Sequence, residues 1–72
     1  MLATDQILDL LRNGEWHELR EIAEKAQLHE VKVEIITSFL AEYNFLKFDK
    51  EEKKTKLSPQ LQLFLKKIKD IE

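Results

Sequence analysis

The sequence predicts a mostly α-helical fold with a small β-hairpin, in the order helix, helix, helix, hairpin, helix. Three observations support this prediction. The 72 residues include one glycine and one proline, and 36% of them are charged, a composition that favours helices joined by short loops. Apolar residues recur at helical spacing in four segments. Before the last segment the pattern changes to alternation, which is typical of paired strands. The length predicts a single domain over residues 1–72.

The first helix is expected within TDQILDLLRNG, residues 4–14. Ile7, Leu8 and Leu11 lie at helical spacing and form one apolar face. Thr4 can cap the start of this helix. Gly14 can end it, because glycine readily adopts the left-handed conformation.

The second helix is expected within EWHELREIAEKAQL, residues 15–28. Its apolar residues follow the i, i+3, i+4, i+7 pattern, and they are Leu19, Ile22, Ala23 and Ala26. His17 stands at the position of an N-cap. Trp16 precedes the helix, and we expect it to be largely buried at one end of the core. A short extra strand could form near Trp16.

The third helix is expected from about His29 to Tyr43. Its core-facing residues lie at i, i+3, i+7 and i+10, and they are Val33, Ile36, Leu40 and Tyr43. Since β-branched residues are mediocre helix formers, tertiary packing must stabilise this helix. Asn44 is expected to end it, because asparagine tolerates a positive φ better than most residues.

A β-hairpin is expected next. FLKFD and KTKL both alternate, with Leu46 and Phe48 on one face of the first strand, and KEEK between them forms the turn. Ser58 and Pro59 then provide an N-cap and a first helical residue. The last helix has a broad apolar face, which consists of Leu61, Phe64, Leu65, Ile68 and Ile71.

This order of elements resembles the winged helix-turn-helix family of small bacterial and archaeal regulators. The resemblance lies in the spacing of ILDLL, in ELREIAEKAQL, in Val33, Ile36 and Leu40, and in the entry LSPQLQLFL into the last helix. NFLKF stands where the family commonly has Gly-Leu-Ile, so Asn44 replaces the usual glycine. The resemblance implies a cytoplasmic DNA-binding regulator of transcription. Its third helix would enter the major groove of double-stranded DNA, and its hairpin, the wing, would contact the backbone.

Candidate DNA contacts lie in the hairpin and in the third helix. Segment 47–56 has five lysines against three acidic residues, a net charge of +2, whereas the whole chain has −2. These lysines are Lys47, Lys50, Lys53, Lys54 and Lys56. They can bind phosphates, or they can protect an exposed strand edge from aggregation. His29 and Lys32 are the candidates in the third helix, but three glutamates against one lysine give that helix −2, which disfavours a groove walled by phosphates.

A second apolar stripe lies on the third helix, away from its core face. Val31, Ile35 and Phe39 recur at i, i+4 and i+8, where the family resemblance places DNA. The chain's own terminal segments could cover this stripe, a protein could bind it, or thymine methyl groups could contact it. The alternative to DNA binding is therefore a protein–protein interaction module that uses this face, and a bare stripe would favour it. Leu10 and Leu63 also lie off their helix faces and could form the seam of a homodimer.

Other classes of function find no support in the sequence. Without cysteine, and with two histidines in different elements, no metal or cofactor site is expected. Thr37, Ser38 and Thr55 lack nucleophile–base spacing and no glycine-rich loop is present, so we expect neither an enzyme nor a small-molecule substrate. We expect no contact with a membrane, because no apolar run could span one and the first residues lack signal-peptide features.

Overall fold

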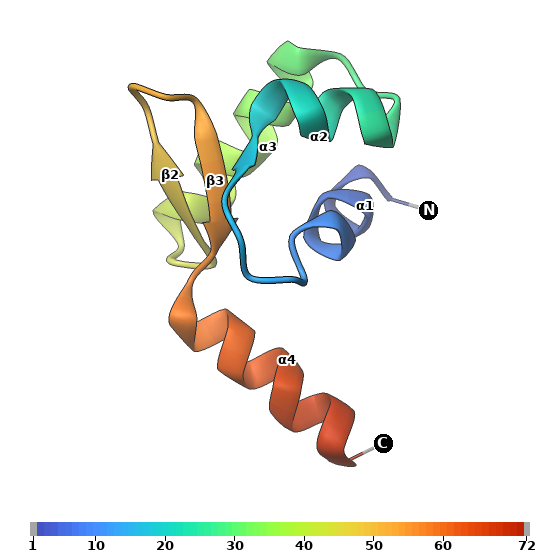
Figure 1. Cartoon of the computed structure of the whole chain (residues 1–72), viewed down its shortest axis with the longest axis vertical. Coiled ribbons are helices and arrows are strands. Elements are labelled where there is room, and N and C mark those ends of the chain that lie inside the picture. Colours follow the sequence, from blue (N-terminus) through green and yellow to red (C-terminus); the bar gives the residue numbers. More distant parts are fainter. Residues whose placement is uncertain (1, 72) are drawn as a thin grey trace.

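The computed structural model describes residues 2–71, which form four helices and one three-stranded antiparallel sheet (Figure 1). In chain order the elements are α1 (Ala3–Leu10), β1 (His17–Glu18), α2 (Leu19–Ala26), α3 (Glu30–Glu42), β2 (Leu46–Asp49), β3 (Lys54–Leu57) and α4 (Pro59–Ile71). The predicted helix-rich fold with a hairpin is confirmed, and so is the short extra strand beside Trp16.

The sheet has the order β1-β3-β2, with β3 in the centre. In the hairpin, Leu46 is opposite Leu57 and Phe48 is opposite Thr55. On the other side of β3, His17 pairs with the same Thr55. Thr55 is fully buried, and its hydroxyl donates a hydrogen bond of 2.6 Å to the carbonyl of Lys47. The buried polar group is thereby satisfied inside the sheet.

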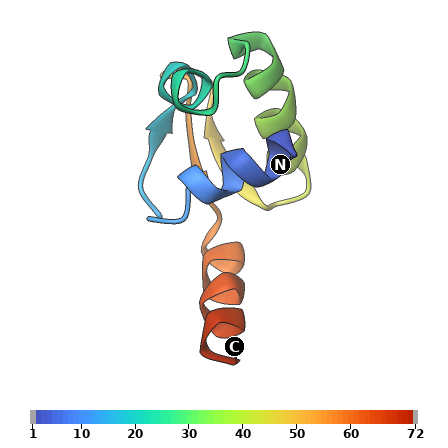
Figure 2. The ribbon, with the colours of Figure 1, turned by 90° about the vertical axis from the view of Figure 1, so that its right-hand side faces the viewer.

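Helices α1, α2 and α3 pack together on one face of this sheet, as the two views in Figure 1 and Figure 2 show. These three helices and the hairpin contribute apolar residues to the core, because burial of apolar surface is the main favourable term in folding. The residues that form the buried core are Ile7, Leu11, Leu19, Ile22, Ala23, Val33, Leu40, Leu46 and Leu57. With so short a chain, this cluster leaves part of the apolar surface uncovered.

Two predicted helix boundaries are confirmed, those at Asn44 and Ser58. Gly14 and Asn44 both adopt the left-handed conformation, with φ of 76° and 66°, but α1 ends at Leu10 with Leu11 as its C-cap, so Gly14 does not end that helix. Ser58 caps α4, since its hydroxyl accepts a hydrogen bond of 3.1 Å from the backbone N–H of Leu61. Gln27, with φ of 56°, ends α2 in the same left-handed way, which the sequence did not predict.

Two predicted caps are wrong. Helix α1 begins at Ala3, with Leu2 as its N-cap and no capping side chain, so Thr4 lies inside the first turn. Helix α2 begins at Leu19, with Glu18 as its N-cap. His17 is instead part of β1, because this segment first pairs with β3 and only then turns into the helix.

The predicted burial of Trp16 and Tyr43 is also wrong. Trp16 is 41% exposed and Tyr43 is 60% exposed. Trp16 directly precedes β1, and its ring lies beside two lysine side chains of β3 instead of in the core. Tyr43 follows the last residue of α3, where the helical turn directs its ring onto that of Phe39, with 4.9 Å between ring centroids.

Helix α4 projects away from the rest of the fold (Figure 2). Leu61 and Leu65 are half-buried and pack against the core. The other members of the predicted apolar face are exposed: Phe64 at 57%, Ile68 at 37% and Ile71 at 85%. The first two turns of α4 therefore contact the body through Leu61 and Leu65, while Phe64, Ile68 and Ile71 remain exposed within the described residues.

Candidate functional site

Helix α3 has two apolar faces, and the structure covers only one of them. Val33, Thr37 and Leu40 are buried against the sheet and α2. The buried hydroxyl of Thr37 donates a hydrogen bond of 2.8 Å to the carbonyl of Val33, so this face contains no unsatisfied polar side chain. Ile36 packs against the core as predicted.

The opposite face of α3 is an exposed apolar stripe, which we call the α3 stripe. It extends the predicted stripe by one residue, at constant i+4 spacing, and consists of Val31, Ile35, Phe39 and Tyr43. Their exposed fractions are 60%, 65%, 56% and 60%. None of the described terminal segments covers the α3 stripe, although the sequence alone allowed such a cover. Tyr43 was assigned to the wrong face because positions 36, 40 and 43 also fit a helical pattern.

The α3 stripe forms one wall of a groove between α3 and β2. Val31, Ile35 and Phe39 contribute its apolar surface from α3, and Phe48 contributes from β2. The other side chains that line it are Glu34, Ser38, Ala41, Glu42 and Lys50. Two carboxylates against one amine make this apolar groove acidic at its rim.

A second hollow lies between the start of α3 and the tip of the hairpin. It is lined by Glu18, Arg20, Glu30, Glu51, Glu52 and Lys53, which are four carboxylates against two cations. His29 and Lys32, the predicted DNA contacts of this helix, are both exposed nearby in sequence. A duplex that touched both the hairpin tip and the start of α3 would bring its phosphates to these carboxylates, which would repel them.

The five hairpin lysines do not form a single cluster. Lys47 and Lys56 are opposite each other in the register of β2 and β3, so they share one face of the sheet. Lys54, two residues from Lys56, lies on the same face. Lys50 and Lys53 are in the turn, where Lys50 borders the α3 groove and Lys53 borders the acidic hollow.

Trp16 joins the lysines on this outer face of the sheet. The ammonium groups of Lys54 and Lys56 are 5.5 Å and 4.8 Å from the centroid of its ring, within cation–π range. The carboxylate of Glu52 forms an ion pair with Lys54 and raises the pKa of its ammonium group. Lys54 is therefore already partnered, and Lys47 and Lys56 are better placed to meet a phosphate.

The histidine at position 17 has a structural role. Its Nδ1 atom lies 3.0 Å from Oε2 of Glu21, and its Nε2 atom lies 2.9 Å from Oδ1 of Asn13. The same Glu21 oxygen accepts a hydrogen bond of 2.9 Å from Lys25. The pKa of Glu21 is lowered, first by Lys25 and then by His17. Within residues 2–71, no three His, Cys, Asp or Glu side chains are grouped so as to hold a metal ion.

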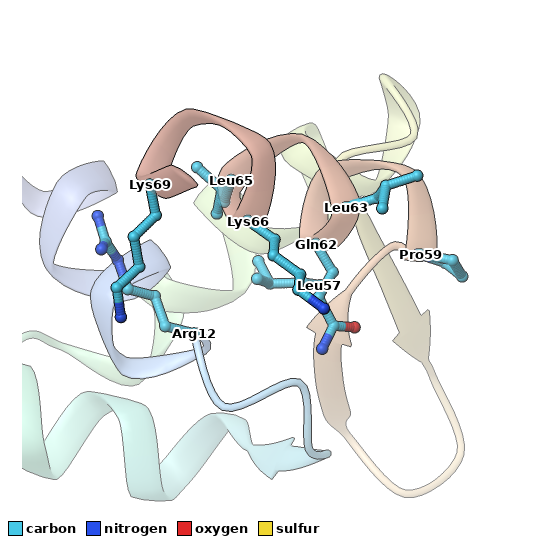
Figure 3. A pocket seen from close by; sticks show the side chains of 8 residues that line it. All are labelled: Arg12, Leu57, Pro59, Gln62, Leu63, Leu65, Lys66 and Lys69. Carbon is cyan, nitrogen blue, oxygen red and sulfur yellow. The ribbon is translucent and has the colours of Figure 1, made fainter. Parts of the chain in front are cut away.

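Leu10 and Leu63, the predicted homodimer seam, lie in different environments in the single chain, and the seam itself stays a prediction. Leu10 is half-buried and packs against the core. Leu63 is 56% exposed and lines a pocket beneath α4 (Figure 3). That pocket also includes Arg12, Leu57, Pro59, Gln62, Leu65, Lys66 and Lys69. The exposed members of the predicted apolar face of α4, which are Phe64, Ile68 and Ile71, form a larger surface than Leu63 alone.

Neither a comparison with protein-family models nor one with curated proteins gives a match to this chain. In the part of the chain that the structure describes, no helix has the length and apolar character needed to cross a membrane. The functional argument therefore depends on the surfaces described above: the α3 stripe with its groove, and the outer face of the sheet with Lys47, Lys54 and Lys56, which it shares with Glu18 and Asp49.

Proposed function

We propose that this chain is a winged-helix domain that binds a protein partner through the α3 stripe and the adjoining groove, with little affinity for DNA. The observation that supports this proposal is the bare stripe on the helix that the family resemblance would place in the major groove. Ile35, at its centre, is 65% exposed. An exposed apolar surface of this kind, rimmed by polar side chains, is typical of a protein interface.

Burial of the α3 stripe would supply a substantial part of the free energy that a partner needs to bind. Full burial of one such side chain contributes about 1.5–3 kcal/mol. Since somewhat more than half of each of the four side chains is exposed, a partner that covered them would gain roughly 4–7 kcal/mol before the cost of association. Central apolar and aromatic anchors such as Phe39 and Tyr43 are the usual hot spots of protein interfaces.

The charge near α3 argues against DNA as the main partner. The helix has three glutamates and one lysine, a net charge of −2, and the hollow at its start has four carboxylates and two cations. Affinity for nucleic acid depends mainly on neutralising phosphates with Lys and Arg. A protein partner with basic and apolar side chains would instead be attracted to this surface.

Site-specific photo-crosslinking in cells tests the proposal. Benzoylphenylalanine in place of Phe39 keeps an aromatic side chain in the α3 stripe, and the same residue in place of the exposed Glu24 on α2 is the matched control. We expect protein adducts from position 39 and none from position 24. The proposal would be contradicted if position 39 gave no adduct. It would also be contradicted if nuclease digested the adducts, because they would then contain nucleic acid instead of protein. The mass of the adduct also shows whether the partner is a second copy or a different protein.

A second candidate function is weak binding of double-stranded DNA through the outer face of the sheet. It is favoured by the exposed Trp16 between two lysines, with Lys47 and Lys56 paired beside it. Replacement of Lys47 and Lys56 by alanine should lower affinity for random duplex DNA evenly across sequences and reduce the salt slope by up to about two units. Replacement of Lys66 and Lys67 on α4 removes the same charge and should leave any such binding nearly unchanged.

A further inference from the structure

We infer that the partner of the α3 groove is helix α4 of a second copy of this chain, so that two copies exchange their last helices. This inference deepens the proposed function and rests on it. It begins from the observation that, among residues 2–71, two helices expose several apolar side chains along one face. One such face is the α3 stripe, and the other is the exposed face of α4, which consists of Phe64, Ile68 and Ile71.

The two surfaces are complementary in charge. Helix α4 has Lys66, Lys67 and Lys69 against Asp70, a net charge of +2. Helix α3 has a net charge of −2, and the groove beside its stripe has a carboxylate excess. Both helices are 13 residues long, and the exposed α4 face, from Phe64 to Ile71, is shorter than the α3 stripe and can lie within it. Lys67 lies beside the exposed apolar face, whereas Lys66 and Lys69 line the pocket beneath α4, so the complementarity is between the net charges of the two helices.

Charge also decides among the ways in which two copies could pair. A contact between the two α4 helices would bring +2 against +2, and a contact between the two α3 helices would bring −2 against −2. Only the mixed contact brings opposite charges together. Like charges across an interface are a strong element of specificity against the wrong pairing.

Helix α4 is held with its apolar face away from its own body. Its start is capped by Ser58, and its half-buried Leu61 and Leu65 contact the core. The side chain of Gln62 lies against Gly14, so close that a Cβ atom there would clash with the Gln62 amide group. These contacts orient the first two turns, and the helix extends from the body as a projecting arm (Figures 1 and 2).

The apolar area is adequate for a stable dimer. Full burial of a large apolar side chain contributes about 1.5–3 kcal/mol, which at about 25 cal/mol per Å² corresponds to roughly 60–120 Å² of apolar surface. The exposed parts of the seven apolar side chains on the two surfaces then amount to roughly 250–500 Å² for one contact. A twofold exchange makes two such contacts, because each copy supplies one α3 and one α4. Since about 60% of a typical interface is apolar, the total approaches the standard size of a specific interface.

Disulfide trapping between two differently tagged copies tests this pairing, because the chain has no cysteine of its own. One copy has Ser38→Cys, in the α3 groove, and the other has Ile68→Cys, on α4. In the exchanged dimer these two cysteines face each other, whereas two copies of the same variant place each cysteine against an unmodified residue. We expect the yield of the mixed disulfide to exceed the yield of each same-variant disulfide by at least about tenfold. Random collision of equal amounts of the two variants would give a ratio of only about twofold. In the control, Glu24→Cys, at an exposed position of α2, is used in place of one of the two cysteine variants. Its mixed disulfide should form only at the ratio of about twofold that random collision gives.

Each alternative result has a distinct meaning. A dominant disulfide between two Ile68→Cys copies, or between two Ser38→Cys copies, would overturn the inference by showing that like helices pair. Sedimentation that shows a monomer at all accessible concentrations would also overturn it. If position 39 nevertheless crosslinks to another protein in cells, the proposed interaction function stands and only the identity of the partner is wrong. If the exchange is correct, Ile35→Glu raises the dissociation constant of the dimer by at least about 100-fold while the monomer stays folded.

Discussion

Alanine substitutions at Ile22 and Ile35 remove the same atoms from opposite environments, and they measure directly which faces of the helices form the core. Ile22 on α2 is fully buried in the central cluster. Ile35 on α3 is 65% exposed at the centre of the α3 stripe. Both lie inside helices, so the change in backbone propensity is the same for the two variants.

The two expected losses of stability differ severalfold. Ile22→Ala removes a buried side chain and leaves a cavity, which costs about 2–5 kcal/mol. At Ile35 about a third of the side chain is covered, so the lost burial amounts to roughly 0.5–1 kcal/mol with no cavity. Alanine also gains a few tenths of a kcal/mol from its better helix propensity. The net cost of Ile35→Ala is therefore about 0–0.7 kcal/mol. A domain of this length has roughly 4–11 kcal/mol of stability in total, so the difference is easily measured.

Urea unfolding followed by circular dichroism provides the measurement, at a protein concentration low enough to keep the chain monomeric. We expect the midpoint to fall strongly for Ile22→Ala and hardly at all for Ile35→Ala, with equal slopes. At higher concentration Ile35→Ala should lose more stability, because association stabilises the folded state by mass action. An equal loss for both variants at low concentration would refute the reasoning, since Ile35 would then belong to the core of the monomer.

Three further predictions concern local features of the fold. Ser58→Ala should lower stability by about 0.5–2 kcal/mol through loss of the N-cap of α4, and a parallel loss of helical signal in circular dichroism would locate the effect. Gly14→Ala should lower stability by at least about 1–2 kcal/mol, because φ at this position is 76° and the added Cβ would clash with Gln62. Adding Gln62→Ala should relieve the clash and leave the cost of the left-handed backbone. Complete rescue of the thermal midpoint in the double variant would contradict a backbone cost at Gly14. Glu21→Gln should destabilise the protein at neutral pH, because the ion pair with Lys25 lowers the pKa of Glu21 in the folded state. That stabilisation is present above the ordinary pKa of 4.5 and is lost as the pH falls through the lowered pKa. The thermal midpoints of the parent and of Glu21→Gln should therefore converge in acid. A difference in midpoint that stays constant with pH would show that the loss of stability does not arise from the charge of Glu21.

The sequence by itself determined the kinds of elements, their order and several of their boundaries. The boundaries at Asn44 and Ser58 and the left-handed conformation of Gly14 were predicted correctly, because a left-handed residue or an N-cap depends on its own chemistry and on neighbours within one turn. The end of α1 was not, since that helix stops at Leu10. The buried faces of α1 and α2 and the alternation in the hairpin were also predicted correctly, since side-chain direction follows the period of the element. These are local properties, and the printed sequence contains them in full.

Tertiary structure decided which apolar faces are covered. Helix α3 has two stripes with acceptable helical spacing, and only packing against the sheet and α2 buries Val33 and Leu40 while Ile35 remains outside. The pairing of β1 with β3 brought Trp16 beside Lys54 and Lys56 on the outer face of the sheet, whereas position in the sequence suggested the core. The physical reason is that a 72-residue chain has more apolar surface than one small core can enclose. Local periodicity identifies each apolar face, but the competition for the limited interior is settled only when all elements are packed together.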